Sequence, residues 1–141
     1  MADLNIGKYE FLAKDINMFE STYESCSDSS GSTIYFVRIH ETQKSKYDFY
    51  HDEEQLVIKK LMEYLLKKMN EDGPAFARIG NFIININNVK DIKIKKDDDF
   101  YIVEIKFLNK EKFELYSGRN EEEALEILDS YFDQEAEHYG L

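Results

Sequence analysis

The chain has 141 residues, of which 43% are hydrophobic, and this is enough apolar material for one globular body with a packed core. Its formal net charge of -11 argues against a direct nucleic-acid binder or anionic-membrane binder, because such partners attract clusters of Lys and Arg. The single cysteine excludes an internal disulfide, and with neither a long apolar run nor a signal-like start the expected location is cytoplasmic.

The first predicted element is a β-hairpin over residues 3–16. Its tight turn is Ile6-Gly7-Lys8-Tyr9, where a positive φ suits the glycine, and apolar residues alternate on both sides. The stretch STYESCSDSSGST, from Ser21 to Thr33, is rich in Ser and lacks spaced apolar residues. A surface loop is expected there, with contact to a partner as the alternative function.

Two strands and a helix are predicted next. Apolar residues alternate with polar ones in IYFVRI at 34–39 and in KYDFY at 46–50, which predicts two strands joined by a polar turn. A capping pair, Asp52 with Gln55, then opens a helical pattern whose apolar residues recur at steps of three and four as far as Met69. The turn-forming segment MNEDGP at 69–74 ends this helix.

The same elements then follow a second time in the same order. A second hairpin over 76–89 carries the turn Ile79-Gly80-Asn81-Phe82. FYIVEI at 100–105 matches IYFVRI, and KFELY at 112–116 matches KYDFY. A second capped helix begins at Asn120 with Glu123 three residues on.

This recurrence predicts an α+β fold with an internal duplication. The expected arrangement is two tandem β-rich units, each of about five antiparallel strands plus a C-terminal helix, related by a pseudo-twofold axis. The units are assigned to residues 1–71 and 75–141, fused into one globular body. Eight apolar residues are expected in the core: Val37, Ile39, Leu61, Leu65, Val103, Ile105, Leu128 and Phe132.

Residues that could carry catalysis or hold a metal are sparse. Only HDEE at 51–54 places a histidine beside carboxylates, at a predicted helix N-terminus where acids are ordinary. Cys26 lies among serines and acidic residues, which disfavour a reactive thiolate. Because there is no Gly-rich phosphate loop, nucleophile elbow or paired Cys or His motif, no catalytic residue, metal or cofactor is assigned and an enzyme is not expected.

Most of the net charge lies in the last helix and tail. From Arg119 to Leu141 there are eight acidic residues and one basic residue. Five of the acids recur at steps of four, three, four and four, which places them on one helix face as an acidic stripe: Glu122, Glu126, Asp129, Asp133 and Glu137. The stripe is either a solvated face that keeps the protein soluble or a docking surface for a basic partner.

The leading hypothesis is a non-enzymatic acidic binding or inhibitor protein of immunity-protein, antitoxin or phage anti-defence type, by analogy of size, charge and missing chemistry. Its acidic stripe would cover a basic surface of a protein partner such as a nuclease, without direct contact to nucleic acid or membrane. One alternative is a small-ligand or nucleotide-binding module, a sponge or sensor, with its pocket at the seam of the two units. Another is a structural subunit that self-associates through exposed strand edges.

Overall fold

The fold is built from ten strands, two short 3-10 turns and one long helix within the part of the chain that is described. The computed structural model describes residues 4–6, 9–25, 33–51, 63, 66, 67 and 76–138. The first half contains β1 (Leu4–Ile6), β2 (Tyr9–Phe11), η1 (Ala13–Asp15), β3 (Ile16–Ser25), β4 (Thr33–Glu41) and β5 (Lys46–His51). The second half contains β6 (Phe76–Ile79), β7 (Phe82–Asn85), η2 (Ile86–Asn88), β8 (Val89–Asp97), β9 (Phe100–Phe107), β10 (Lys112–Gly118) and α2 (Glu121–His138).

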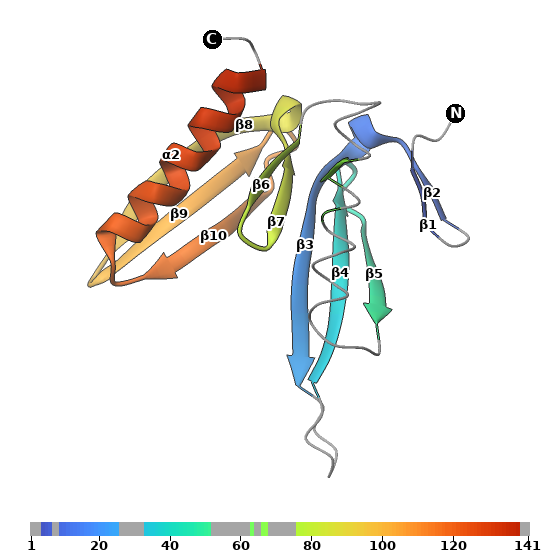
Figure 1. The fold of residues 1–141 in the computed structure, drawn as a ribbon, viewed down its shortest axis with the longest axis horizontal. Coiled ribbons are helices and arrows are strands. Elements are labelled where there is room, and N and C mark those ends of the chain that lie inside the picture. Colours follow the sequence, from blue (N-terminus) through green and yellow to red (C-terminus); the bar gives the residue numbers. More distant parts are fainter. Residues whose placement is uncertain are drawn as a thin grey trace.

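The strands form two antiparallel sheets and one separate hairpin. The larger sheet has the order β5-β4-β3-β7-β6, the smaller sheet has the order β10-β9-β8, and β1 and β2 form a two-stranded sheet of their own. Helix α2 lies along one face of the small sheet, and the β6–β7 hairpin stands between this layer and β3 (Figure 1). The predicted α+β class is therefore confirmed.

The two sheets do not follow the boundary between the two predicted units. Strand β7 belongs to the second half of the sequence, yet it pairs with β3, with Ile83 opposite Phe19. Two self-contained units with a sheet and a helix each are therefore not supported. The physical reason is that the β6–β7 hairpin is apolar on both faces, because Ile83 packs into one core and Ile84 into the other. Most of the helix predicted for the first unit lies outside the described residues, and its three described residues, Glu63, Leu66 and Lys67, are helical.

Local features of the two halves nevertheless recur at matching positions. Each half contains a hairpin, a 3-10 turn and a three-stranded meander in that order. A register shift interrupts β3 just after Ile16 and β8 just after Val89, at the first residue of each strand. The turns that follow β4 and β9 contain Lys44 and Lys110 with positive φ values of 70° and 78°. The halves thus resemble each other in local structure, although they share one of the sheets.

Two hydrophobic cores lie on opposite faces of the five-stranded sheet. The first core is formed by Phe11, Ala13, Ile16, Phe19, Val37, Ile39, Phe76 and Ile83, with Leu66 and Tyr47 packed against it. The second core fills the space between the hairpin, the small sheet and α2, and includes Met18, Ala77, Ile84, Ile92, Val103, Ile105, Phe107, Leu115, Ala124 and Tyr131. Neighbouring residues of β3, β6 and β7 alternate between these two cores, as the period of a strand requires.

The predicted core is confirmed in the strands and is partly wrong in the last helix. Val37, Ile39, Val103 and Ile105 are all buried, whereas Leu61 and Leu65 lie outside the described residues. Leu128 is only partly buried, and Phe132 keeps 44% of its surface exposed. Tyr131 is fully buried instead, so the buried face of the helix, centred on Ala124 and Tyr131, is turned by about 70° from the face that the prediction implied.

The stretch from Ser21 to Thr33, predicted as a loop, is strand at both ends. Strand β3 continues to Ser25 and β4 begins at Thr33, and the two strands remain paired as far as Ser25 opposite Thr33. The backbone N–H and C=O groups of the paired strands bond to each other, and Thr and Tyr favour strands. The outer part of the β3–β4 pair therefore needs no regular apolar pattern. Residues 26–32, including Cys26, lie outside the described residues.

Glu41 is a buried carboxylate at the end of β4, with only 8% of its surface exposed. Burial raises the pKa of Glu41 above its usual value, the hydrogen bond from Gln43 partly offsets this, and the charge of Asp15 raises the pKa further. A carboxyl group whose pKa is raised by folding destabilises the folded state at pH values above its unfolded pKa. That cost disappears as the pH falls and the folded protein binds the proton.

Replacing Glu41 by Gln is therefore expected to stabilise the protein at neutral pH. The E41Q variant should have a free energy of unfolding larger than wild type by about 0.5–1 kcal/mol at pH 7. It should lose this advantage below about pH 4, where the wild-type carboxyl is protonated in both states. Urea denaturation at both pH values measures the difference, with the exposed Glu114→Gln as the control. If E41Q were more stable than wild type by the same amount at both pH values, burial of the Glu41 charge could not be the cause of the difference.

Candidate functional site

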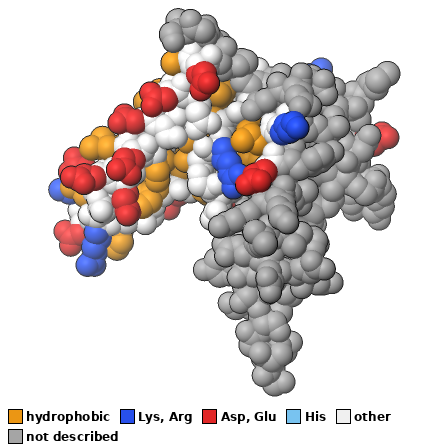
Figure 2. Space-filling view, viewed as in Figure 1, with side chains coloured by type: hydrophobic (Ala, Val, Ile, Leu, Met, Phe, Trp, Pro, Cys, Tyr) orange, Lys and Arg blue, Asp and Glu red, His pale blue; other side chains and the backbone are white. Residues whose placement is uncertain are grey.

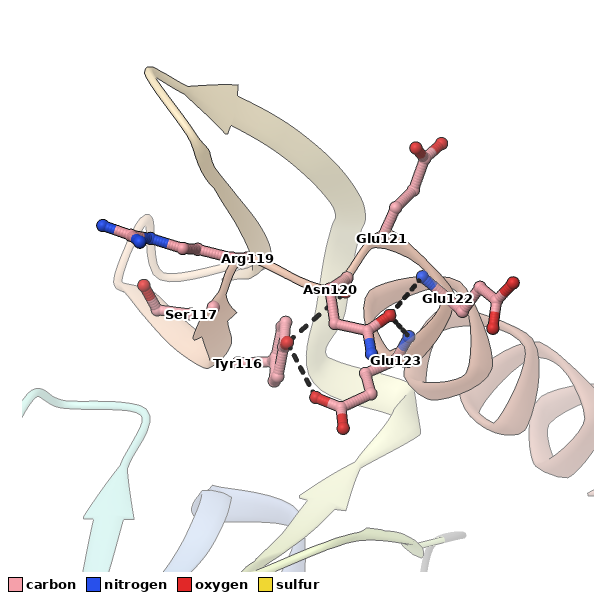
Figure 3. A pocket seen from close by; sticks show the side chains of 8 residues that line it. Tyr116, Ser117, Arg119, Asn120, Glu121, Glu122 and Glu123 are labelled. Atoms are coloured by element: carbon pink, nitrogen blue, oxygen red, sulfur yellow. Dashed lines mark hydrogen bonds between the residues drawn. The ribbon is translucent and has the colours of Figure 1, made fainter.

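Helix α2 begins at a side-chain cap that fixes its first turn. The Asn120 Oδ1 atom accepts hydrogen bonds from the backbone N–H groups of Glu122 at 3.0 Å and Glu123 at 3.3 Å, which confirms the predicted N-cap. The Glu123 carboxylate does not close a capping box. It accepts a hydrogen bond of 2.9 Å from the Tyr116 hydroxyl and so ties the helix start to β10 (Figure 3).

The helix is anchored a second time near its other end, by Gln134. The backbone N–H of Arg78 donates to Gln134 Oε1, and Gln134 Nε2 donates to the carbonyl of Arg78, both at 2.9 Å. A side-chain amide thereby pairs with the β6 backbone as a neighbouring strand would. Together with the buried Ala124 and Tyr131, this contact sets the rotation of the helix.

The structure places all five residues of the acidic stripe on the solvent side of α2. At 100° per residue they fall within a sector of about 80°, opposite the line of Ala124 and Tyr131 that faces the core. Each of the five is exposed, and within the described part of the chain none of them forms an ion pair. Figure 2 shows acidic side chains along this helix with hydrophobic ones between them. The result is a concentrated negative surface on a firmly anchored element.

Two large apolar side chains lie exposed beside the acidic stripe. Leu125 has 43% and Phe132 has 44% of its surface exposed. They are two helical turns apart on the same flank, about 100–120° from the buried line. Of these two residues, Phe132 was expected in the core. Exposed aromatic and aliphatic side chains at the border of a charged surface are typical of protein interfaces.

A basic surface on the same half of the molecule was not expected from the sequence. The outer face of the small sheet, away from α2, carries Lys93, Lys95 and Lys112 around Glu104. Lys95 Nζ lies 2.9 Å from a Glu104 carboxylate oxygen, and this hydrogen bond is the main reason that the pKa of Glu104 is lowered. The alternating lysines in the segment VKDIKIKKD at 89–97 could have indicated this surface, because alternate residues of a strand lie on the same face of a sheet.

Two hollows were found at the surface of the C-terminal half. The larger, of about 800 Å³, is an open depression lined by residues 116–123 at the start of α2 (Figure 3). Its lining includes three glutamates and Arg119, whose guanidinium lies over the Phe100 ring at 5.3 Å. The smaller, of about 200 Å³, lies between β8 and α2. Both of these hollows belong to the C-terminal half, and the alternative of a ligand pocket at the seam of the two units stays a prediction.

The side chains considered for catalysis fall outside the described part of the chain. Cys26 and the side chain of His51 lie outside the described residues. Within the described ranges, no cluster of three or more His, Cys, Asp or Glu side chains could hold a metal ion. In the same ranges, no helix has the length and hydropathy needed to cross a membrane. Comparison with protein-family models, curated proteins and solved structures found no match to this chain.

Proposed function

We propose that the protein is a non-enzymatic binding or inhibitor protein whose acidic stripe on α2 docks on a basic surface of a protein partner. Immunity proteins, antitoxins and phage anti-defence proteins act in this way, and the basic partner would be a nuclease or another nucleic-acid-binding enzyme in the cytoplasm. The observation that carries the proposal is a row of five exposed carboxylates, free of ion pairs within the described structure, on an anchored helix.

The anchoring supports docking because a rigid charged surface loses little conformational freedom on binding. Asn120 and Gln134 hold the two ends of the helix, so the stripe is organised before the partner arrives. Successive acids of the stripe rise about 6 Å along the helix axis, which is close to the spacing of phosphates along one nucleic-acid strand. A surface that attracts phosphates could therefore bind this row of carboxylates.

The row of like charges on α2 lowers the stability of the helix, and solubility alone would not require such a row. Like charges at steps of three or four on a helix destabilise it by a few tenths of a kcal/mol per pair. Acids dispersed over the sheets would give the same net charge without this repulsion. The exposed Leu125 beside the stripe adds an apolar contact that a purely solvating face does not need.

An origin by internal duplication belongs to the same proposal. The recurring order of elements, the register shifts after Ile16 and Val89, and the turns at Lys44 and Lys110 support two related units over residues 1–71 and 75–141. The pairing of β7 with β3 then joins the units within one sheet. The stripe would be a specialisation of the second unit.

Reversing charge within the stripe tests the function. We expect the triple variant E126K/D129K/D133K to bind a partner captured from the native host at least about tenfold more slowly, because electrostatic steering is lost. Added salt should weaken the wild-type complex, since such attraction is screened over about 8–10 Å. Binding kinetics at two salt concentrations, with circular dichroism to check the helix, give the measurement.

A matched variant shows whether binding depends on the position of the acidic residues or only on the net charge of the protein. Asp97, Asp98 and Asp99 are exposed at the β8–β9 turn, and changing all three to Lys alters the net charge by the same amount. This control should bind close to wild type. If both triple variants lose binding equally, or if neither does, the stripe is not the docking surface.

A further inference from the structure

Strand β8 leaves one edge uncovered at the position where β3 carries a hairpin. In the five-stranded sheet, β3 has β4 on one side and β7 on the other. In the small sheet β8 pairs with β9 and is the last strand, with no further neighbour among the described strands. The two strands correspond in position within their halves, each following a 3-10 turn and carrying a register shift after its first residue. One of two equivalent edges is therefore covered and the other is open.

The space beside the β3 edge is filled by side chains, whereas the space beside the β8 edge is hollow. Beside β3, the hairpin side chains Ile83 and Phe76 pack against Phe19, and the Phe19 and Phe76 ring centroids are 5.9 Å apart. Beside β8 lies the hollow of about 200 Å³, lined by residues 89–92 and by the α2 side chains Tyr131, Phe132 and Glu135. The exposed Phe132 ring borders this hollow. The second half thus has a vacant place where the first half holds a hairpin.

The chain contains a second hairpin of the same kind. The sequence Ile6-Gly7-Lys8-Tyr9 matches Ile79-Gly80-Asn81-Phe82, Ile6 pairs with Tyr9 in β1–β2 as Ile79 pairs with Phe82 in β6–β7, and each hairpin leads into a 3-10 turn. Figure 1 shows β1–β2 at one end of the molecule and the small sheet at the other. The hairpin therefore cannot reach β8 of its own chain without rearrangement, but a hairpin of another copy can.

Charge distinguishes this arrangement from a symmetric pairing of two β8 edges. Strand β8 carries four lysines and two aspartates, so two such edges would repel each other. If the register of Phe19 opposite Ile83 is transferred to the vacant edge, Ile92 lies opposite Glu10 of β2. The exposed Glu10 carboxylate would then enter the hollow, whose charged lining residues are Lys90, Asp91 and Glu135. Of these, Lys90 would attract Glu10, whereas Asp91 and Glu135 would repel it.

We propose that the β1–β2 hairpin of one copy adds to the β8 edge of a second copy, in the way that β6–β7 adds to β3 within the chain. Such a joint uses different surfaces on the two partners, so it produces either a closed ring or an open chain of molecules. Because Glu10 stands where the internal joint has Ile83, the association is weaker than the internal pairing and sensitive to salt. The acidic stripe takes no part in it, and the proposal does not depend on the docking function.

Sedimentation velocity on the whole protein, from about 1 to 200 μM at low and high salt, tests the proposal. Wild type is expected to form larger species as its concentration rises, and added salt should reverse this. Glu10→Lys places two like charges in the joint, as does Lys90→Glu, so each variant alone should associate at least about tenfold more weakly. An equimolar mixture of the two variants should associate again, because each joint in it combines opposite charges.

Two controls make the result specific. Lys110→Glu changes an exposed lysine outside the joint and should behave as wild type, and the stripe variant E126K/D129K/D133K should self-associate normally. Circular dichroism checks that each variant folds. A wild-type protein that stays monomeric throughout, single variants that associate as wild type does, or a mixture that fails to associate would each overturn the proposal.

Discussion

Replacing Tyr131 by Ala is expected to lower the free energy of unfolding by about 3–5 kcal/mol, which is the usual cost of removing a fully buried aromatic side chain. Tyr131 is completely buried in the core between α2, the small sheet and the β6–β7 hairpin. No neighbouring side chain can fill the cavity without distorting the packing of a helix that is held at both ends. The loss is a large part of the stability of a protein of this size.

The adjacent residue provides the control for this prediction. Phe132 lies one position on and keeps 44% of its surface exposed, so Phe132→Ala should change stability by no more than about 0.5 kcal/mol. Urea or thermal denaturation of the two variants measures the contrast. Similar losses in both variants, or a larger loss for F132A, would contradict the rotation of α2 described above.

Replacing Asn85 by Ala is expected to cost about 2–4 kcal/mol, because it removes three hydrogen bonds made by a fully buried side chain. Asn85 is fully buried, and its Nδ2 donates to the carbonyls of Ala13 at 3.3 Å and Ile16 at 2.9 Å. Its Oδ1 accepts from the N–H of Asn87 at 3.1 Å. These bonds join η2 and β7 of the second half to η1 and β3 of the first.

Asn87→Ala is the matched control for Asn85, because the Asn87 side chain is exposed two positions away. It should leave stability within about 0.5 kcal/mol of wild type. Hydrogen exchange adds a local measurement, since N85A should weaken protection at the junction of β3 and β7 most strongly. A loss of stability in N85A no larger than that in N87A would show that these hydrogen bonds contribute little.

Much of the local structure could be predicted from the sequence because local signals determine it. Gly80 has the positive φ, 56°, expected in its hairpin turn, and Asn120 caps α2 as its side chain indicates. Alternating apolar residues correctly identified the buried residues Val103 and Ile105 of β9. In each of these cases the preference of a few neighbouring residues agrees with the final fold.

The rotation of α2 could not be predicted because the helix has two apolar rows, one residue apart. Ala124 and Tyr131 form one row, and Leu125 and Phe132 form the other. Their hydrophobicity does not favour the row that is buried. The pairing of Gln134 with Arg78 and the shape of the core settle the choice, and both depend on residues far away in the sequence.

The same limit applies to the sheets and to the candidate site. Periodicity identified β7 as a strand but contained no information on whether its partner would be β3 or a strand of its own half. The exposure of the acidic stripe followed from its helical spacing, whereas the exposed Leu125 and the lysines of the small sheet became evident only from the packing. Which surface of an element is covered, and by which neighbour, depends on residues far apart in the sequence.

The shared hairpin has a consequence for how the chain folds as it is synthesised. Strand β3 is complete at Ser25, but the strand that covers its second edge begins at Phe82. Until that later segment leaves the ribosome, the nascent first half has an open strand edge and an uncovered core face, both of which favour aggregation. The N-terminal half therefore cannot reach its final state ahead of the C-terminal half. Long-range pairing of this kind slows folding and makes it a single cooperative event for the two halves.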